Sequence, residues 1–218
     1  MKKNSILVAF VLLPIASCSN HPPIPNYYKT LPAEVAQNPA LAKALDTKQV
    51  DVDLLEWAIF YETNIRRQRL GLLPLRYENR LRQGSRAHSQ EMEELKYFAH
   101  VSPVEENASV KKRFMNAGIK NGLGGENIAI HPVKKKQQIV FRLSSTAALS
   151  RYAWRNQGAP YTYREFAEDL LSRWLTSVPH RRNILSRGFR FLGVGVAPAV
   201  YGGTDVFYIT QNFSSTNY

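Results

Sequence analysis

The sequence predicts an α+β domain, because helical periodicity dominates its middle and two strand-like runs close it. Apolar residues recur at helical spacing over 54–65, with Asp53 as a candidate N-cap, and Gly71 ends the pattern. Two runs rich in β-branched and aromatic residues, 191–200 and 204–213, flank a Gly-Gly pair and indicate a C-terminal β-hairpin. Helices first and strands last are typical of α+β folds.

Three more helices are expected between these regions. The first covers about 78–95 and the second about 109–116, each with apolar residues at helical spacing. The third begins at the capping box Thr162-x-x-Glu165, and we expect its Trp174 in the core. A short helix is also expected near 38–45, ahead of the domain.

The N-terminus has the anatomy of an export signal. Lys2 and Lys3 precede a short apolar run, and the run Ile15-Ala16-Ser17-Cys18 resembles the lipobox of bacterial lipoproteins. The resemblance implies that residues 1–17 are a signal peptide and that Cys18 carries acyl chains such as palmitate as a membrane anchor. The alternative is an ordinary signal peptide that contains a cysteine. Ser19 implies sorting to the outer membrane of the cell envelope, where the source has one.

The segment 18–50 is expected to be a lipidated cysteine followed by a semi-extended tether, since five of the twelve prolines fall between Pro22 and Pro39. The folded domain is then expected to cover 51–218. Hydrophobic residues make up 44% of the chain, which is enough for a sizeable core. The single cysteine excludes an intrachain disulfide, so packing must stabilise the domain.

The net charge of +12 favours anionic partners, such as a lipid or another anionic component of the envelope, although a solubility surface is the simpler explanation. Nucleic acid is not expected as a partner, because the charge is scattered and no nucleic-acid-binding motif accompanies it. We expect a monomer. The sequence contains no GxSxG, HExxH or P-loop motif, so the common hydrolase and nucleotide-binding signatures are absent.

A series of short motifs follows in a fixed order between about residues 54 and 214. They are Asn64-x-x-Arg67-x-x-x-Gly71-Leu72-x-Pro74-Leu75, His88-Ser89-x-x-Met92, Tyr97-Phe98-x-His100-x-Ser102-Pro103, Arg113-x-x-x-Ala117-Gly118, Gly125-Glu126-Asn127-Ile128-Ala129, Trp174-x-x-Ser177-x-x-His180-Arg181-x-Asn183-Ile184-Leu185, Gly193-Val194-Gly195-Val196 and Thr210-Gln211-x-Phe213. Each motif alone is weak, but the series resembles the bacterial branch of the CAP superfamily, the SCP-like extracellular proteins. The resemblance implies a three-layer α-β-α sandwich. The chain departs from the family's pattern at about 131–161, where we expect an insertion beside the cleft that is either a lid or a packed surface excursion.

The resemblance also implies a cleft with two histidines and two glutamates. His100, Glu126 and His180 match three of these positions, and Ser177 stands at the fourth. We therefore expect these four residues to line one ligand-binding cleft. His88 is expected at the surface and His131 in a loop, and neither is expected to contribute.

Three kinds of chemistry are open to His100, Glu126 and His180. The two histidines are candidate ligands for Zn²⁺ or another divalent cation, since neutral imidazole is a good zinc ligand. The three side chains could instead act as general acid and base, and they are the candidate catalytic residues of an enzyme. They could also simply hydrogen-bond one another and hold the fold together.

The sequence thus favours a membrane-anchored, extracytoplasmic binding module over an enzyme. Its ligand would be a lipid, a glycan or a protein, with a divalent metal as an optional component of the cleft. One alternative is a hydrolase that uses His100, Glu126 and His180, either with a metal or by acid-base chemistry. A second alternative is a surface interaction or virulence factor whose cleft is vestigial.

Overall fold

The computed structural model describes residues 35, 37–141, 151–155 and 158–217. Its main sheet has the strand order β1 (Arg76–Tyr77), β5 (Phe191–Tyr201), β6 (Thr204–Ser214), β2 (Gly124–Pro132). β1 runs parallel to β5, whereas β5, β6 and β2 are antiparallel neighbours. β5 and β6 form the C-terminal hairpin, so this prediction is confirmed.

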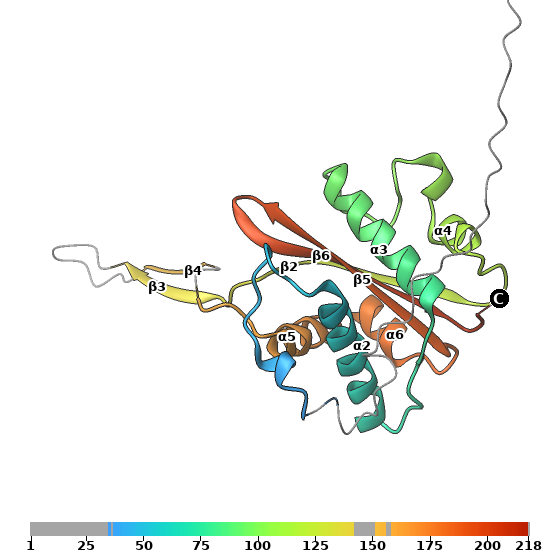
Figure 1. Ribbon diagram of the computed structural model, residues 1–218, viewed down its shortest axis with the longest axis horizontal. Helices are drawn as coiled ribbons and strands as arrows, with labels where there is room; N and C mark the ends of the chain where they lie inside the picture. The colour runs from blue at the N-terminus through green and yellow to red at the C-terminus, as the bar shows by residue number, and fades with distance from the viewer. Residues whose placement is uncertain (1–34, 36, 142–150, 156–157, 218) are drawn as a thin grey trace, which may run out of the picture.

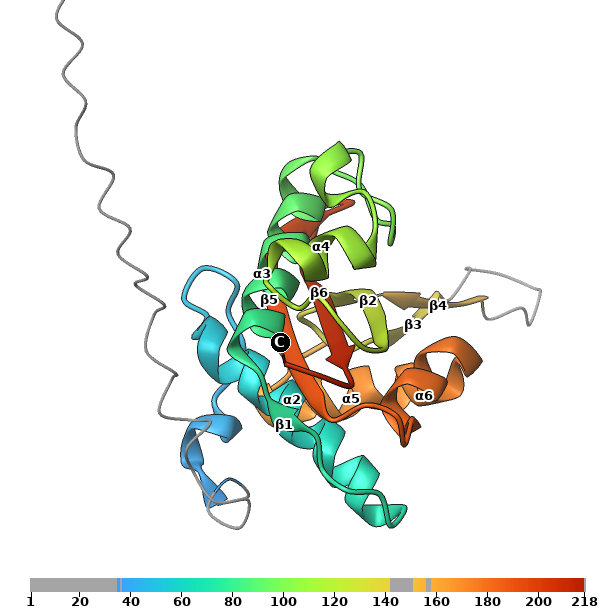
Figure 2. The ribbon, with the colours of Figure 1, turned by 90° about the vertical axis from the view of Figure 1, so that its right-hand side faces the viewer.

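Helices cover both faces of this sheet (Figures 1 and 2). One face carries α3 (Asn79–Glu94) and α4 (Val110–Asn116), joined by a loop with the 3-10 turn η3 (Glu105–Asn107). The other face carries α2 (Val52–Arg69), α5 (Tyr163–Thr176) and α6 (Val178–Leu185). The α+β class and the three-layer α-β-α sandwich are therefore confirmed. None of the helices in the described ranges combines the length and apolar character needed to cross a bilayer.

Each face of the sheet has its own hydrophobic core. The larger core fills the space under α2 and α5 and includes Ile59, Phe166, Trp174 and Phe207. The smaller core lies under α3 and includes Met92, Ile128, Ala197, Val206 and Tyr208. Because alternate residues of a strand face opposite sides, β2 and β6 contribute to both cores.

The contact between α3 and β5 is unusually close. A Cβ built at Gly195 would lie 2.0 Å from the backbone nitrogen of Arg86 in α3, and one at Gly193 would lie 2.1 Å from that of Arg82. The hydroxyls of two small α3 residues donate across the same contact, Ser85 to the Gly193 carbonyl at 3.1 Å and Ser89 to that of Gly195 at 3.0 Å. Only glycine allows this approach, which fixes the position of α3 on the sheet.

The helix starts show ordinary capping chemistry. Asp51 caps α2 by accepting from the Leu54 backbone nitrogen at 3.0 Å, so the expectation that Asp53 caps this helix is wrong. Asp53 instead pairs with Arg86 of α3 at 2.6 Å. The capping box of Thr162 and Glu165 at the start of α5 is confirmed.

The packed domain begins earlier than residue 51. Leu41 and Leu45 lie in the larger core, and the Leu45 backbone nitrogen donates to the Tyr161 carbonyl at 2.8 Å. The short helix expected near 38–45 is the 3-10 helix η2 (Pro39–Ala42), capped by Asn38. The tether expected up to residue 50 is therefore too long at its C-terminal end. The expected signal peptide, Cys18 and the prolines up to Pro32 lie outside the described residues.

The insertion expected at 131–161 contains a second, two-stranded sheet. Its strands β3 (Gln137–Phe141) and β4 (Arg151–Arg155) pair antiparallel and project from the body of the domain (Figure 1). The hairpin follows β2 at the strand end opposite to Glu126, so the described part of the insertion does not cover the candidate cleft. Residues 142–150 lie outside the described residues.

Candidate functional site

The candidate site lies at the edge strand β2, between the loop after α3 and the helix α6 (Figure 2). Neighbouring residues of β2 face opposite sides of the sheet, because side chains alternate along a strand. Glu126 accordingly faces α3 and α4, while Asn127 faces α6. The edge of the sheet therefore joins two polar groups that approach it from different layers.

Glu126 is the buried centre of the first group, with a side chain that is 1% exposed. Both of its carboxylate oxygens accept from Nη2 of Arg113 in α4, at 2.8 and 2.7 Å. Its Oε1 also lies 2.8 Å from Nδ1 of His100. Arg113 further donates to the backbone carbonyls of His100 and Asn107, at 3.1 and 2.8 Å, and so holds the loop that carries His100.

The Glu126 carboxyl is ionised at neutral pH in this setting. Burial raises its pKa, but the hydrogen bond with His100 and the nearby charges of Arg113 and His88 outweigh burial and leave the pKa below its usual range. A buried carboxylate needs such partners, because an unpaired charge is strongly disfavoured away from water.

His88 is buried in α3, so the expectation of a surface histidine is wrong. Its ring lies between two carboxylates, with Nδ1 3.9 Å from Glu91 and Nε2 3.9 Å from Glu126. Burial lowers the pKa of His88, although both carboxylates oppose this. The sequence signal that could have revealed its position is the helical spacing of His88 with Leu81, Ser85 and Met92, all of which are buried.

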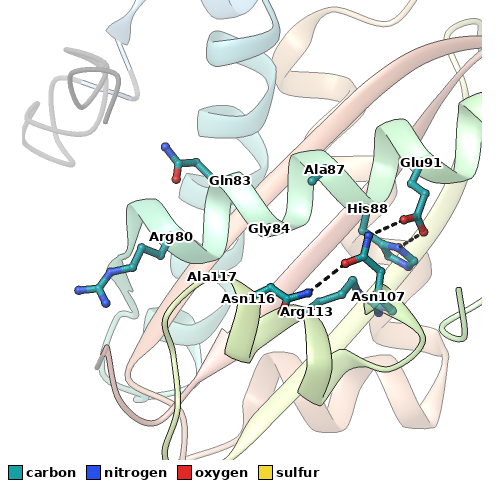
Figure 3. Close-up of a pocket in the computed structure, with 10 residues that line it drawn as sticks. All are labelled: Arg80, Gln83, Gly84, Ala87, His88, Glu91, Asn107, Arg113, Asn116 and Ala117. Carbon is teal, nitrogen blue, oxygen red and sulfur yellow. Dashed lines mark hydrogen bonds and ion pairs between the residues drawn. The ribbon is translucent and has the colours of Figure 1, made fainter. Parts of the chain in front are cut away.

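Glu91 organises the polar cluster behind His88. Its carboxylate accepts from Ser102 at 2.5 Å, from Asn107 at 2.7 Å and from the Tyr97 hydroxyl. Figure 3 shows this carboxylate facing both Asn107 and His88, with Arg113 on the same side of the helix. These hydrogen bonds lower the pKa of Glu91 against the effect of burial and pin the loop 97–107 to α3.

The second polar group lies on the α6 side of β2. Asn183 donates from Nδ2 to the Glu126 backbone carbonyl at 3.1 Å and to Oδ1 of Asn127 at 2.9 Å. Asn127 in turn donates to the backbone carbonyl of His180 at 3.3 Å. These bonds give the Glu126 backbone carbonyl a partner and hold α6, which carries His180, against the strand.

His180 is half-buried and packs against Trp174, with 6.1 Å between the ring centroids. Burial lowers its pKa, and the charge of His100 lowers it further. The imidazole of His180 is therefore neutral at physiological pH. The side chain of His100 is 50% exposed, so it is the solvent-facing member of the pair.

Ser177 lies between α5 and α6, three residues before His180, and is partly buried. Its hydroxyl does not cap α6. The structure therefore joins His100 directly to Glu126, and it ties the backbone of His180 to the next strand residue, Asn127. Arg113 also belongs to this site through its ion pair with Glu126, although the sequence suggested no role for it.

A metal centre of three protein ligands does not fit these residues. Within the described ranges, no three His, Cys, Asp or Glu side chains converge as metal ligands. Both oxygens of Glu126 already accept from Arg113, which leaves at most the imidazoles of His100 and His180 as donors. Catalytic zinc sites use three protein ligands, and these residues supply at most two.

His131 is a structural histidine of the core rather than a loop residue, which corrects the expectation. It lies buried in β2, where its Nε2 is 2.7 Å from Asp169 and its ring stacks edge-on against Phe166 at 4.6 Å between centroids. Burial lowers its pKa, although the hydrogen bond with Asp169 opposes this.

The domain is similar to known bacterial proteins. The sequence profile of the family described as "CAP: Cysteine-rich secretory protein family" matches residues 60–213. "Uncharacterized protein YkwD" of Bacillus subtilis is 31% identical over 133 residues, which is 61% of this chain and 38% of that protein. "Uncharacterized membrane protein YlbC" of the same species is 28% identical over 151 residues, or 69% of this chain and 32% of that protein.

A crystal structure of an extracellular protein with an SCP domain from Bacillus anthracis has a TM-score of 0.51 and 26% identity to this chain. The match covers 76% of this chain and 44% of that one. This chain therefore spans less than half the length of these three relatives, and the likeness concerns the domain that they share.

Proposed function

Because the chain belongs to the CAP family of cysteine-rich secretory proteins, in its bacterial extracellular form, we propose that it is a binding module of the cell envelope. The ligand would bind at the cleft of His100, Glu126, Ser177 and His180. We further propose that Cys18 anchors the chain to the membrane by its lipid, in the outer membrane where the source has one. The lone cysteine at the lipobox position supports this anchor.

One observation carries the proposal for the cleft: His100 is oriented by a buried carboxylate while half of its side chain faces solvent. Because Nδ1 faces Glu126, the ring proton of the neutral imidazole lies on Nδ1. The exposed Nε2 is then a fixed hydrogen-bond acceptor. The neutral imidazole of His180 beside it adds a second polar group without adding charge.

This arrangement fits a ligand that donates hydrogen bonds and carries no strong charge at the contact. A hydroxyl-rich envelope glycan has this chemistry, because its hydroxyls can donate to an imidazole nitrogen.

The hydrolase alternative has less support from the same residues. Glu126 is bound by Arg113 through both oxygens, so it is a poor proton acceptor for catalysis. The Ser177 hydroxyl does not contact a base among the described residues, which an activated serine nucleophile requires. The residues thus orient and bind, and they do not form a nucleophile-base pair.

Calorimetry with soluble glycan fragments prepared from a bacterial envelope tests this proposal. Wild-type protein is expected to bind, and His100→Ala is expected to lose binding while it keeps its unfolding temperature. Met115→Ala, an exposed residue on the neighbouring α4, is the control and is expected to bind like wild type. Equal binding by His100→Ala and wild type would show that the cleft is not the binding site.

A further inference from the structure

A groove at another edge of the domain is lined by arginines. It lies between the α2–β1 loop, which supplies Gly71 to Arg76, and the α6–β5 loop, which supplies Arg187 to Arg190. β1 and β5 are parallel neighbours, so the loops that precede them meet at the same end of the sheet (Figure 2). The groove has a volume of about 470 Å³.

Arg67 forms the buried floor of this groove. The residue is only 2% exposed, and its partners are backbone carbonyls. Its Nε donates to Leu73 at 3.0 Å, and its Nη1 donates to Ile184 at 2.7 Å and to Ser186 at 2.8 Å. A guanidinium has five N–H donors, so both donors of Nη2 remain without a partner in the described part of the chain.

The positive charge of the groove is not neutralised by the protein. Arg76, Arg187 and Arg190 are exposed along its rim, and no aspartate or glutamate lines it. Across the described ranges, no carboxylate forms an ion pair with any of these three arginines or with Arg67. Four cations therefore converge around one space with no counter-charge, which raises the local positive potential.

We propose that this groove binds a phosphate group. Arginine forks match phosphate oxygens through paired, charge-assisted hydrogen bonds, and the unpartnered Nη2 of Arg67 offers such donors at the floor. The phosphate belongs either to a small soluble phosphate compound or to the headgroup of an anionic lipid. Leu73 on the rim is 75% exposed and would contact acyl chains only in the second case.

The test uses the full chain with Cys18→Ala, so that no lipid anchor contributes. Its binding is measured with inorganic phosphate by calorimetry, and with vesicles by co-sedimentation. One vesicle preparation contains equal parts of phosphatidylglycerol and phosphatidylcholine, and the other contains phosphatidylcholine alone. The groove variant is Arg187→Gln/Arg190→Gln. The control, Lys111→Gln/Lys112→Gln, removes the same charge from exposed positions on α4.

The groove variant is expected to lose about tenfold in affinity for each arginine removed, the order of a charge-assisted hydrogen bond. The control is expected to lose far less. If the groove variant loses affinity for inorganic phosphate, the site binds soluble phosphate compounds. If it loses affinity only for the phosphatidylglycerol vesicles, and Leu73→Ser also binds these vesicles more weakly, the site binds a lipid headgroup. The proposal is overturned if wild type binds neither probe, or if the groove and control variants lose affinity equally.

Discussion

The ion pair between Arg113 and Glu126 gives the sharpest prediction about the candidate site. Arg113→Gln removes the arginine that pairs with Glu126 and leaves a buried carboxylate beside His100. Breaking a buried pair by removing one partner costs about 3–5 kcal/mol, because the remaining charge stays out of water. This is a large part of the roughly 5–15 kcal/mol that stabilises a typical domain.

The double variant Arg113→Gln/Glu126→Gln is the control. It leaves no buried charge, so we expect it to be more stable than Arg113→Gln by about 2 kcal/mol or more. It does not return to wild-type stability, because Arg113 also holds the backbone carbonyls of His100 and Asn107. Urea unfolding of the three proteins at neutral pH measures both differences.

The pH dependence gives an independent check. In wild type the pKa of Glu126 lies below its usual range, so its contribution to stability is present above the unfolded pKa of about 4.5 and is lost as pH falls through the folded value. In Arg113→Gln, burial is expected to raise this pKa instead. The difference in unfolding free energy between the two proteins should therefore shrink as pH falls from about 7 to about 4. A difference that does not change with pH, or a double variant no more stable than Arg113→Gln, would refute this reasoning.

Three further predictions concern packing, titration and anchoring. Gly195→Ala in β5 should destabilise the protein by at least about 3 kcal/mol, because its Cβ would lie 2.0 Å from the backbone nitrogen of Arg86. Gly84→Ala in α3 has room, with its nearest neighbour at 3.8 Å, and should stabilise the protein by about 0.5–1 kcal/mol. Urea unfolding compares the two variants. Burial lowers the pKa of His131, so the unfolded chain binds more protons and stability should fall as pH drops below about 6.5, less steeply in His131→Gln. Cys18→Ala should release the protein from the membrane fraction or block its processing; unchanged fractionation and lipid mass would contradict the anchor.

Much of the fold could be predicted from short motifs whose residues lie close together in the sequence. The capping box at Thr162 marks the start of α5, and the Gly-Gly pair at 202–203 marks the turn of the β5–β6 hairpin. Both features depend on residues close together in the chain. The N-terminal boundary could not be placed in this way, because Leu41 and Leu45 are buried by contacts with α5 and with the strand-like segment around Tyr161, far along the chain.

The candidate site was only partly predictable for the same reason. The resemblance brought His100 and Glu126 together, and the structure confirms that they are in contact. The position of His88 depends on which face of α3 meets the sheet. Its polar neighbours in the sequence led us to expect it at the surface. The partnership of Arg113 with Glu126 depends on α4 crossing the end of β2, which no local pattern encodes.

The close contact at Gly193 and Gly195 shows a further limit. The sequence indicates a strand there, but a glycine in a strand can mark a bulge, a bend or a close approach. The structure selects the last of these, since the backbone of α3 occupies the space where side chains would be. This contact also sets the position of His88 and Glu91, which extend from the same helix toward the site.

The tautomer of His100 is the most direct test of the proposed site. The proposed site requires a proton on Nδ1, facing Glu126, and an unprotonated Nε2 that accepts a hydrogen bond from the ligand. Nitrogen-15 NMR of the full chain at about pH 8, above the usual histidine range, distinguishes the two ring nitrogens by their chemical shifts. We predict a protonated Nδ1 and an unprotonated Nε2 for His100; a protonated Nε2 would contradict the account.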